Sequence, residues 1–142
     1  MGKWCWFTTH DTYIKEGKGK VKAVGNVMAK GGLQGYLVDK KTADKLGIKS
    51  VMDIKKHAKQ FDSNGDGKAD MVACPPGWGC EKQITKHFAE LGLGDFINPI
   101  QADYSASMAD AIAKYKNGKS ILVYTWTPNW TVGALELGKD VV

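Results

Sequence analysis

Short apolar runs alternate with helical patterns along this chain, and this alternation limits the folds that it can adopt. Four segments have the apolar character of strands: residues 21–28, 34–39, 96–101 and 121–125. Four others have helical spacing of apolar residues or helix-capping signals: residues 40–46, 51–61, 79–91 and 107–115. Strands that alternate with helices predict an α/β layered domain.

Small residues mark where several of these helices begin and end. Gly47 follows residues 40–46 and Gly92 follows residues 79–91, in positions where glycine commonly closes a helix. Ser50 stands just before residues 51–61, where a serine side chain can cap a helix N-terminus. These local signals predict the helix boundaries.

Composition limits the number of domains and the partners. The chain has 142 residues, of which 43% are hydrophobic and 25% charged, so residues 1–142 are expected to form one domain. The net charge is +5, and the lysines are scattered among 15 acidic residues with a local cluster only at residues 15–22. We interpret them as a solvated surface and expect no nucleic-acid partner.

No apolar run approaches the roughly 18 residues that a membrane span needs, and the first residues lack the apolar stretch of a secretory signal. As written, the chain is therefore expected in the cytoplasm, or as a fragment of an exported protein. No Ser/His/Asp set, Cys/His pair or pair of carboxylates has the spacing of a catalytic site. We expect neither enzymatic activity nor a cofactor.

Residues 61–70, FDSNGDGKAD, partly match a calcium-binding loop. Four residues fit its first half: Asp62, Asn64, Asp66 and Gly67. Ala73 stands where the bidentate glutamate should be, which leaves Asp70 as the further carboxylate. A surface turn rich in Asx and Gly is favoured over a bound cation at these candidate ligands.

Tryptophan is frequent, with five residues in 142. Trp78 has a glycine on either side and prolines before it in CPPGWGC, so we expect a loop to present its ring. Cys74 and Cys80 stand at the two ends of this stretch and could close the loop, which would leave Cys5 unpaired.

Several indoles from separate loops would form an aromatic cage. The electron-rich faces of such a cage attract a cation that cannot donate hydrogen bonds, and quaternary ammonium groups are the usual guests. Gly79, Cys80 and Glu81 begin the helix expected at residues 79–91, where free backbone N–H groups favour a carboxylate. A cation cage beside an anion-binding helix start predicts a betaine as the ligand.

Four stretches of this chain resemble, in sequence order, the glycine betaine and proline betaine binding proteins of bacterial ABC importers: CPPGWGCE, FDSNGDGKAD, GGLQGYLVDKKTAD and YTWTPNW. The resemblance covers essentially the whole chain. It implies a single α/β lobe of the type II periplasmic-binding-protein-like fold, with a mixed sheet flanked by helices. The implied function is binding of a quaternary ammonium osmolyte, in a family that is periplasmic or extracytoplasmic.

In that family, three tryptophans box the trimethylammonium group, while backbone amides and a histidine hold the carboxylate. The resemblance implies that the box consists of Trp6, Trp78 and Trp126. It implies Gly79, Cys80 and His10 as the carboxylate ligands. The family disulfide would join Cys74 to Cys80.

The chain departs from the family in two ways. Phe7-Thr8 follow Trp6 where the family usually has Thr-Pro, and the chain resembles only the second lobe with part of each crossing between lobes. Residues 1–20 and 120–142 are therefore expected to be inter-lobe crossing segments around a core of residues 21–119. Membrane subunits of an ABC importer are expected as partners only if the missing lobe is present.

Without a first lobe, the terminal segments would expose apolar residues, among them Ile121, Leu122 and Val123. Unpaired strands and exposed indoles favour pairing with a second copy, so we expect a homodimer or higher oligomer through the terminal segments. Two other classes stay open: a truncated or mobile coding fragment that folds as an oligomer without binding a ligand, and an enzyme that acts on choline-like compounds.

Overall fold

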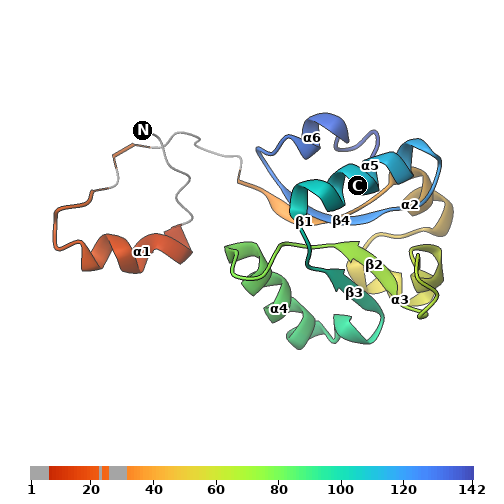
Figure 1. Cartoon of the computed structure of the whole chain (residues 1–142), viewed down its shortest axis with the longest axis horizontal. Coiled ribbons are helices and arrows are strands. Elements are labelled where there is room, and N and C mark those ends of the chain that lie inside the picture. The colour runs from red at the N-terminus through yellow and green to blue at the C-terminus, as the bar shows by residue number, and fades with distance from the viewer. Residues whose placement is uncertain (1–6, 23, 26–31) are drawn as a thin grey trace. The chain divides into compact units, whose positions relative to one another are not determined.

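The computed structural model of the chain describes residues 7–22, 24–25 and 32–142. The chain divides into two compact units, residues 1–31 and residues 32–142. The first unit contains helix α1 (Phe7–Glu16), and the second contains the sheet and the other helices of the described chain (Figure 1).

A four-stranded mixed sheet forms the centre of the second unit. Its strands are β1 (Gln34–Val38), β2 (Ala69–Val72), β3 (Ile97–Ile100) and β4 (Leu122–Trp126). The spatial order is β1-β4-β2-β3, in which β1 is antiparallel to β4 and β2 is parallel to both of its neighbours. The expected α/β fold, a mixed sheet flanked by helices, is confirmed.

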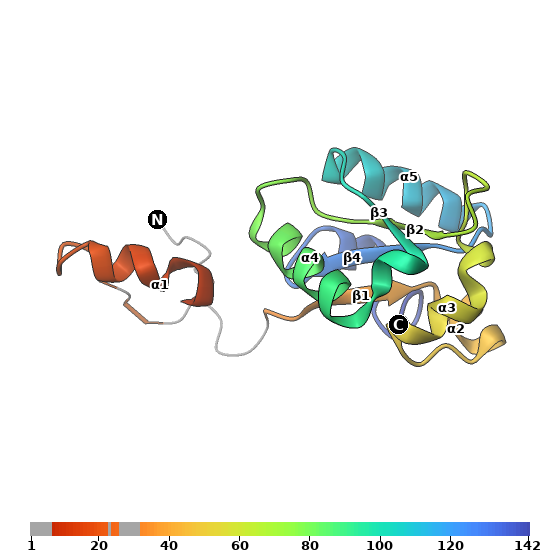
Figure 2. The same ribbon diagram turned by 90° about the horizontal axis from the view of Figure 1, so that it is seen from below.

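The side chains on each face of the sheet form part of a separate hydrophobic cluster. Successive side chains of a strand point to opposite faces, and on β4 Leu122 and Tyr124 belong to one cluster while Val123 belongs to the other. The first cluster includes Ile54 of α3 (Ile54–His57) and Ile84 of α4 (Gly79–Leu91). The second includes residues of α5 (Tyr104–Lys116), and Figure 2 shows α5 on the side of the strands away from α2 (Lys40–Leu46) and α3.

Local capping sets the helix ends that the sequence predicts. Gly47 (φ 68°) and Gly92 (φ 62°) close α2 and α4 in the left-handed conformation that glycine adopts without a steric cost. The Ser50 side chain accepts a hydrogen bond from the Met52 N–H, and the Asp53 carboxylate accepts one from the Ser50 N–H. These contacts form a capping box at the 3₁₀ helix η1 (Val51–Asp53). The expected bounds of residues 40–46 and 79–91 are confirmed.

Two of the predicted helices have different bounds in the structure than the sequence predicts. Residues 51–61 do not form one α-helix but η1, α3 and the 3₁₀ helix η2 (Ala58–Gln60), because the His57 backbone (φ −128°, ψ 18°) leaves the helical region. Ala58 and Phe61 are both buried beyond this break. Helix α5 begins at Tyr104, three residues before the expected start, because the Asp103 side chain caps it by accepting from the Ala106 N–H.

The prediction of a strand at residues 21–28 is wrong for the residues of that segment that the structure describes. Val21 and Val24 are 55% and 85% exposed and lie in no strand, while residues 23 and 26–28 lie outside the described residues. Strand β2 was not predicted, although Ala69 and Met71 in it are fully buried. Its four residues carry little β-branched character, so the local pattern is weak.

The expectation that Ile121, Leu122 and Val123 expose an apolar edge is also wrong. Their exposed fractions are 4%, 2% and 0%, because β4 lies between β1 and β2 in the sheet. The C-terminal segment also pairs beside β1, where Val38 and Val142 exchange backbone hydrogen bonds of 2.8 and 2.9 Å. The remaining elements, η3 (Leu93–Asp95) and α6 (Thr131–Ala134), are short.

Candidate functional site

Three aromatic rings meet at one edge of the second unit. The Trp78 and Trp126 ring centroids are 6.2 Å apart with the planes at 69°, which is an edge-to-face arrangement. The Tyr104 ring lies 5.0 Å from Trp126 and 6.2 Å from Trp78, between centroids. We call Trp78, Tyr104 and Trp126 the aromatic cluster.

The sheet topology brings these rings together. The loop after β2 carries Trp78, the segment after β3 leads to Tyr104 at the start of α5, and Trp126 is the last residue of β4. Because β2, β3 and β4 are parallel, their carboxyl ends lie at the same edge of the sheet. This edge is where open α/β sheets commonly bind ligands.

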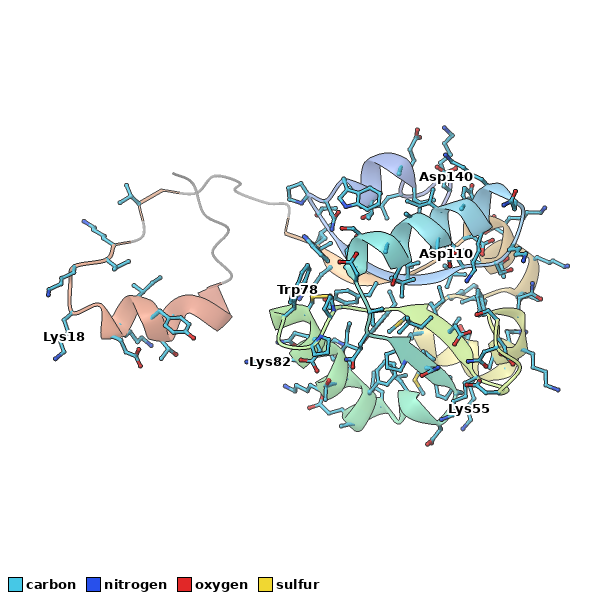
Figure 3. The ribbon with its side chains drawn as sticks, viewed as in Figure 1. Lys18, Lys55, Trp78, Lys82, Asp110 and Asp140 are labelled. Carbon is cyan, nitrogen blue, oxygen red and sulfur yellow. A yellow bond between two sulfur atoms is a disulfide. The ribbon has the colours of Figure 1, made fainter. Side chains whose placement is uncertain are left out.

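A disulfide closes the loop that carries Trp78. Cys74 is fully buried and is bonded to Cys80 in the first turn of α4. Gly77 has φ 86°, which a residue with a side chain rarely adopts, and the Trp78 N–H donates to the Pro75 carbonyl at 3.3 Å. Trp78 is 46% exposed, so the closed loop presents part of this indole to solvent (Figure 3).

The start of α4 lies directly beside the aromatic cluster, because Trp78 is the N-cap residue of this helix. The Trp78 side chain makes no capping hydrogen bond. The backbone N–H groups of Gly79 and Cys80 stand in the first turn, where N–H groups have no carbonyl partner within the helix. Together with the helix dipole, they favour an anion at this position.

Tyr104 is the member of the aromatic cluster that the sequence does not reveal. It is only 4% exposed, and its hydroxyl donates to the Tyr124 carbonyl at 3.0 Å. Burial raises the pKa of the Tyr104 hydroxyl, so the ring stays neutral. No local signal separates Tyr104 from the other tyrosines, because its role depends on the pairing of β3 with β2.

The other predicted site residues are placed as follows. Trp126 is partly buried and contacts both hydrophobic clusters. His10 lies in α1 of the first unit, and Trp6 lies outside the described residues. Of the three predicted carboxylate ligands, Gly79 and Cys80 therefore lie in the second unit, which also contains Trp78 and Trp126.

Residues 62–68 precede β2 and Asp70 lies near its start, so this loop is at the other end of that strand from Trp78. The Asp62 carboxylate accepts hydrogen bonds from the N–H groups of Gly65 at 2.6 Å and Gly67 at 2.8 Å. Asp70 accepts from the Ser63 N–H at 2.9 Å. Within residues 7–22, 24–25 and 32–142, no group of three or more His, Cys, Asp or Glu side chains is arranged to hold a metal ion.

Comparison with known proteins identifies the family. Residues 4–139 match the model of the substrate binding domain of ABC-type glycine betaine transport systems. The chain belongs to this family. The expected resemblance is thus confirmed, and the family is one of binding proteins rather than enzymes.

Two curated relatives of this betaine-transport family are 46% identical to the chain over 140 residues. They are the glycine betaine-binding periplasmic protein OusX of Dickeya dadantii and the glycine betaine/proline betaine-binding periplasmic protein of Escherichia coli. Each match covers 96% of this chain but 42% of the relative, so the chain spans about two fifths of their length.

Solved structures support the fold. A choline binding protein of an ABC transporter, in complex with choline, matches 89% of this chain with a TM-score of 0.60 and 22% identity. A glycine betaine, L-proline binding protein from Borrelia burgdorferi matches 80% with a TM-score of 0.56 and 21% identity. The chain covers 42% and 37% of these two structures.

In the described part of the chain, no helix is both long and apolar enough to cross a membrane.

Proposed function

We propose that this chain binds a quaternary ammonium osmolyte of the glycine betaine or proline betaine type, as part of the substrate-binding component of an ABC importer. The observation that carries the proposal is the aromatic cluster beside the uncapped start of α4. Family membership and the 46% identity to betaine-binding proteins support it.

The cation is proposed to rest on the indoles of Trp78 and Trp126. A trimethylammonium group cannot donate a hydrogen bond, so it gains most from the electron-rich faces of aromatic rings. The partly exposed Trp78 and Trp126 are accessible to a ligand, whereas Tyr104 is only 4% exposed. Tyr104 therefore supports the two indoles rather than contacting the ligand with its hydroxyl.

The carboxylate is proposed to accept hydrogen bonds from the N–H groups of Gly79 and Cys80. Because Trp78 is both a wall of the cage and the N-cap of α4, one residue sets the distance between the cation site and the anion site. The Cys74–Cys80 disulfide holds that residue in place. We further propose that Trp6 supplies a third indole and His10 a further donor to the carboxylate.

Calorimetric titration with three ligands tests this assignment. Glycine betaine should bind, whereas 3,3-dimethylbutanoate, which has the same shape without the positive charge, should bind at least about 30-fold more weakly if cation–π attraction contributes about 2 kcal/mol. Choline lacks the carboxylate, so its affinity relative to that of glycine betaine tests whether the start of α4 contributes to binding. Equal binding of glycine betaine and 3,3-dimethylbutanoate would reject the cage, and no heat with any of the three ligands would favour a fragment that folds without binding.

We also propose that the chain associates with itself through apolar residues of its terminal segments. With residues 121–123 buried, the exposed apolar residues near this end are Trp130 at 52%, Leu137 at 50% and Val142 at 44%. Exposed groups of this kind favour a protein contact. Light scattering should report a dimer or larger species, and Trp130→Ala with Leu137→Ser should shift it towards monomer. A monomer at all concentrations would reject the proposal.

Membrane subunits of an importer would be partners of the whole substrate-binding component.

A further inference from the structure

The positive charge of the second unit is concentrated in one segment of 21 residues. Residues 40–60 contain seven lysines and two aspartates, which gives +5, and the other thirteen lysines are balanced by thirteen acidic residues. Residues 1–31 carry a net charge of +4, and the rest of the second unit, residues 32–39 and 61–142, carries −4. Within the second unit, the excess of positive charge therefore lies in residues 40–60. We call the exposed side of residues 40–60 the lysine face.

The lysine face is formed by α2, η1, α3 and η2. Its six exposed lysines are Lys41, Lys45, Lys49, Lys55, Lys56 and Lys59. Of the salt bridges in the described part of the chain, one lies within residues 40–60, and it joins Lys40 to Asp44. None of the six exposed lysines takes part in these salt bridges. The Asp53 carboxylate is engaged by the N–H groups of Lys49 and Ser50 at 3.0 Å each.

Helices α2 and α3, which carry four of these six lysines, are neighbours at one end of the second unit. Ala43 of α2 and Ile54 of α3 line the same cavity of about 200 Å³. Figure 3 shows Lys55 at the end of this unit opposite to Trp78. The acidic residues 62–70 stand beyond α3 on the side of α5, away from α2, as Figure 2 shows. The lysine face is thus separate from the aromatic cluster.

The chemistry of this face favours a diffuse anionic surface over a shaped partner. The chain contains no arginine, the residue that binds phosphate and carboxylate groups in a fixed bidentate geometry. Lysines are flexible point charges that suit attraction to many anions spread over a plane. Met52, 43% exposed, adds an apolar side chain among them.

Nucleic acid is the less suitable polyanion. Single-stranded nucleic acid is usually bound by stacking its bases on aromatic rings, and residues 40–60 contain no phenylalanine, tyrosine or tryptophan. We propose that the lysine face docks on an anionic phospholipid bilayer, with the aromatic cluster at the opposite end of the unit. This docking surface is independent of the proposed betaine site.

Vesicle co-sedimentation of the full chain tests the docking surface. The chain should bind vesicles of phosphatidylcholine with phosphatidylglycerol but not vesicles of phosphatidylcholine alone, and binding should fall as salt is raised. The triple variant Lys55→Gln, Lys56→Gln, Lys59→Gln should lower the partition coefficient roughly 100-fold, because each lysine near an anionic surface contributes about fivefold.

The matched control is Lys82→Gln, Lys86→Gln, Lys116→Gln, which removes three exposed lysines from α4 and α5. It has the same net charge as the test variant and should retain most of the binding. Equal losses in the two triple variants would overturn the proposal, as would equal binding to neutral vesicles. Tighter, lysine-dependent binding to a single-stranded oligonucleotide than to anionic vesicles would also overturn it. Thermal melts check that both variants are folded.

Discussion

Trp78 and Trp126 lie edge to face, with ring centroids 6.2 Å apart, although 48 positions separate them in the chain. Their backbones meet because β2 and β4 are parallel neighbours, with Val72 opposite Val123. The aromatic cluster is therefore a product of the strand pairing in the sheet.

Replacing Trp78 with alanine should reduce glycine betaine affinity at least about 30-fold, because the ligand loses an aromatic face that contributes about 2 kcal/mol in a desolvated site. Leu91→Ala is the matched control, since Leu91 is similarly exposed at 48% but lies outside the aromatic cluster and the terminal segments. Calorimetric titration of both variants gives the comparison. Unchanged binding by Trp78→Ala would contradict the cage.

Tyr104 should act through its ring rather than its hydroxyl. Tyr104→Phe removes the 3.0 Å hydrogen bond to the Tyr124 carbonyl and should lower the free energy of unfolding by about 1 kcal/mol, while betaine affinity changes little. Tyr104→Ala should cost about 3–5 kcal/mol, because the ring is 96% buried, and should weaken binding as well. Urea denaturation and calorimetry measure the two effects. A large loss of affinity in Tyr104→Phe would instead assign the hydroxyl a direct role.

Reduction of the Cys74–Cys80 disulfide should lower the free energy of unfolding by roughly 2 kcal/mol, as expected for a bond across a loop of this length. It should also weaken betaine binding, because Trp78 lies within the closed loop. The measurement is denaturation and titration with and without a reductant. Thiol counting on the folded, air-exposed protein should find Cys5 alone, and three free thiols would contradict the bond under those conditions.

Asp39 is expected to be the most sensitive carboxylate in the described chain. It is 3% exposed and accepts hydrogen bonds from the N–H groups of Thr42 at 2.8 Å and Ile121 at 3.0 Å. Asp39→Ala leaves both donors unpaired and should cost about 2–4 kcal/mol of stability. Asp44→Ala, whose carboxylate is exposed in the pair with Lys40, should change stability by less than about 1 kcal/mol. Similar losses in both variants would contradict this account.

The loop at residues 62–70 should make stability depend on acid pH. Hydrogen bonds from the backbone N–H of Gly67, and then from Gly65, hold the pKa of Asp62 below its ordinary value. A lowered folded-state pKa gives a stabilisation that is present above the ordinary aspartate pKa of about 3.9 and is lost as pH falls through the lower folded-state value. The difference in melting temperature between the natural chain and Asp62→Asn should therefore shrink below that range.

The same pair of proteins tests the loop as a cation site. Since the carboxylates are engaged by the loop's own N–H groups, micromolar calcium should leave the melting temperature of the natural chain unchanged. A sharp rise that Asp62→Asn abolishes would instead indicate a bound cation.

The sequence by itself determined features that depend on neighbours a few residues away. The ends of α2 and α4 could be predicted because glycine adopts the left-handed backbone at a helix end whatever surrounds it. The presentation of Trp78 by a Pro- and Gly-rich loop is equally local. Trp126 and the disulfide partners followed from resemblance to a family, since spacing alone does not reveal which distant residues meet.

Only the tertiary structure decided which segments meet in the sheet. Strand β2 has a weak local pattern and exists because β3 and β4 pair with it on both sides, which also buries residues 121–123 in place of the expected exposed edge. The same pairing brings Tyr104 to Trp78 and Trp126. Contacts between strands so far apart in sequence depend on the register and direction of pairing, and these are set by burial of the whole sheet rather than by any one stretch of residues.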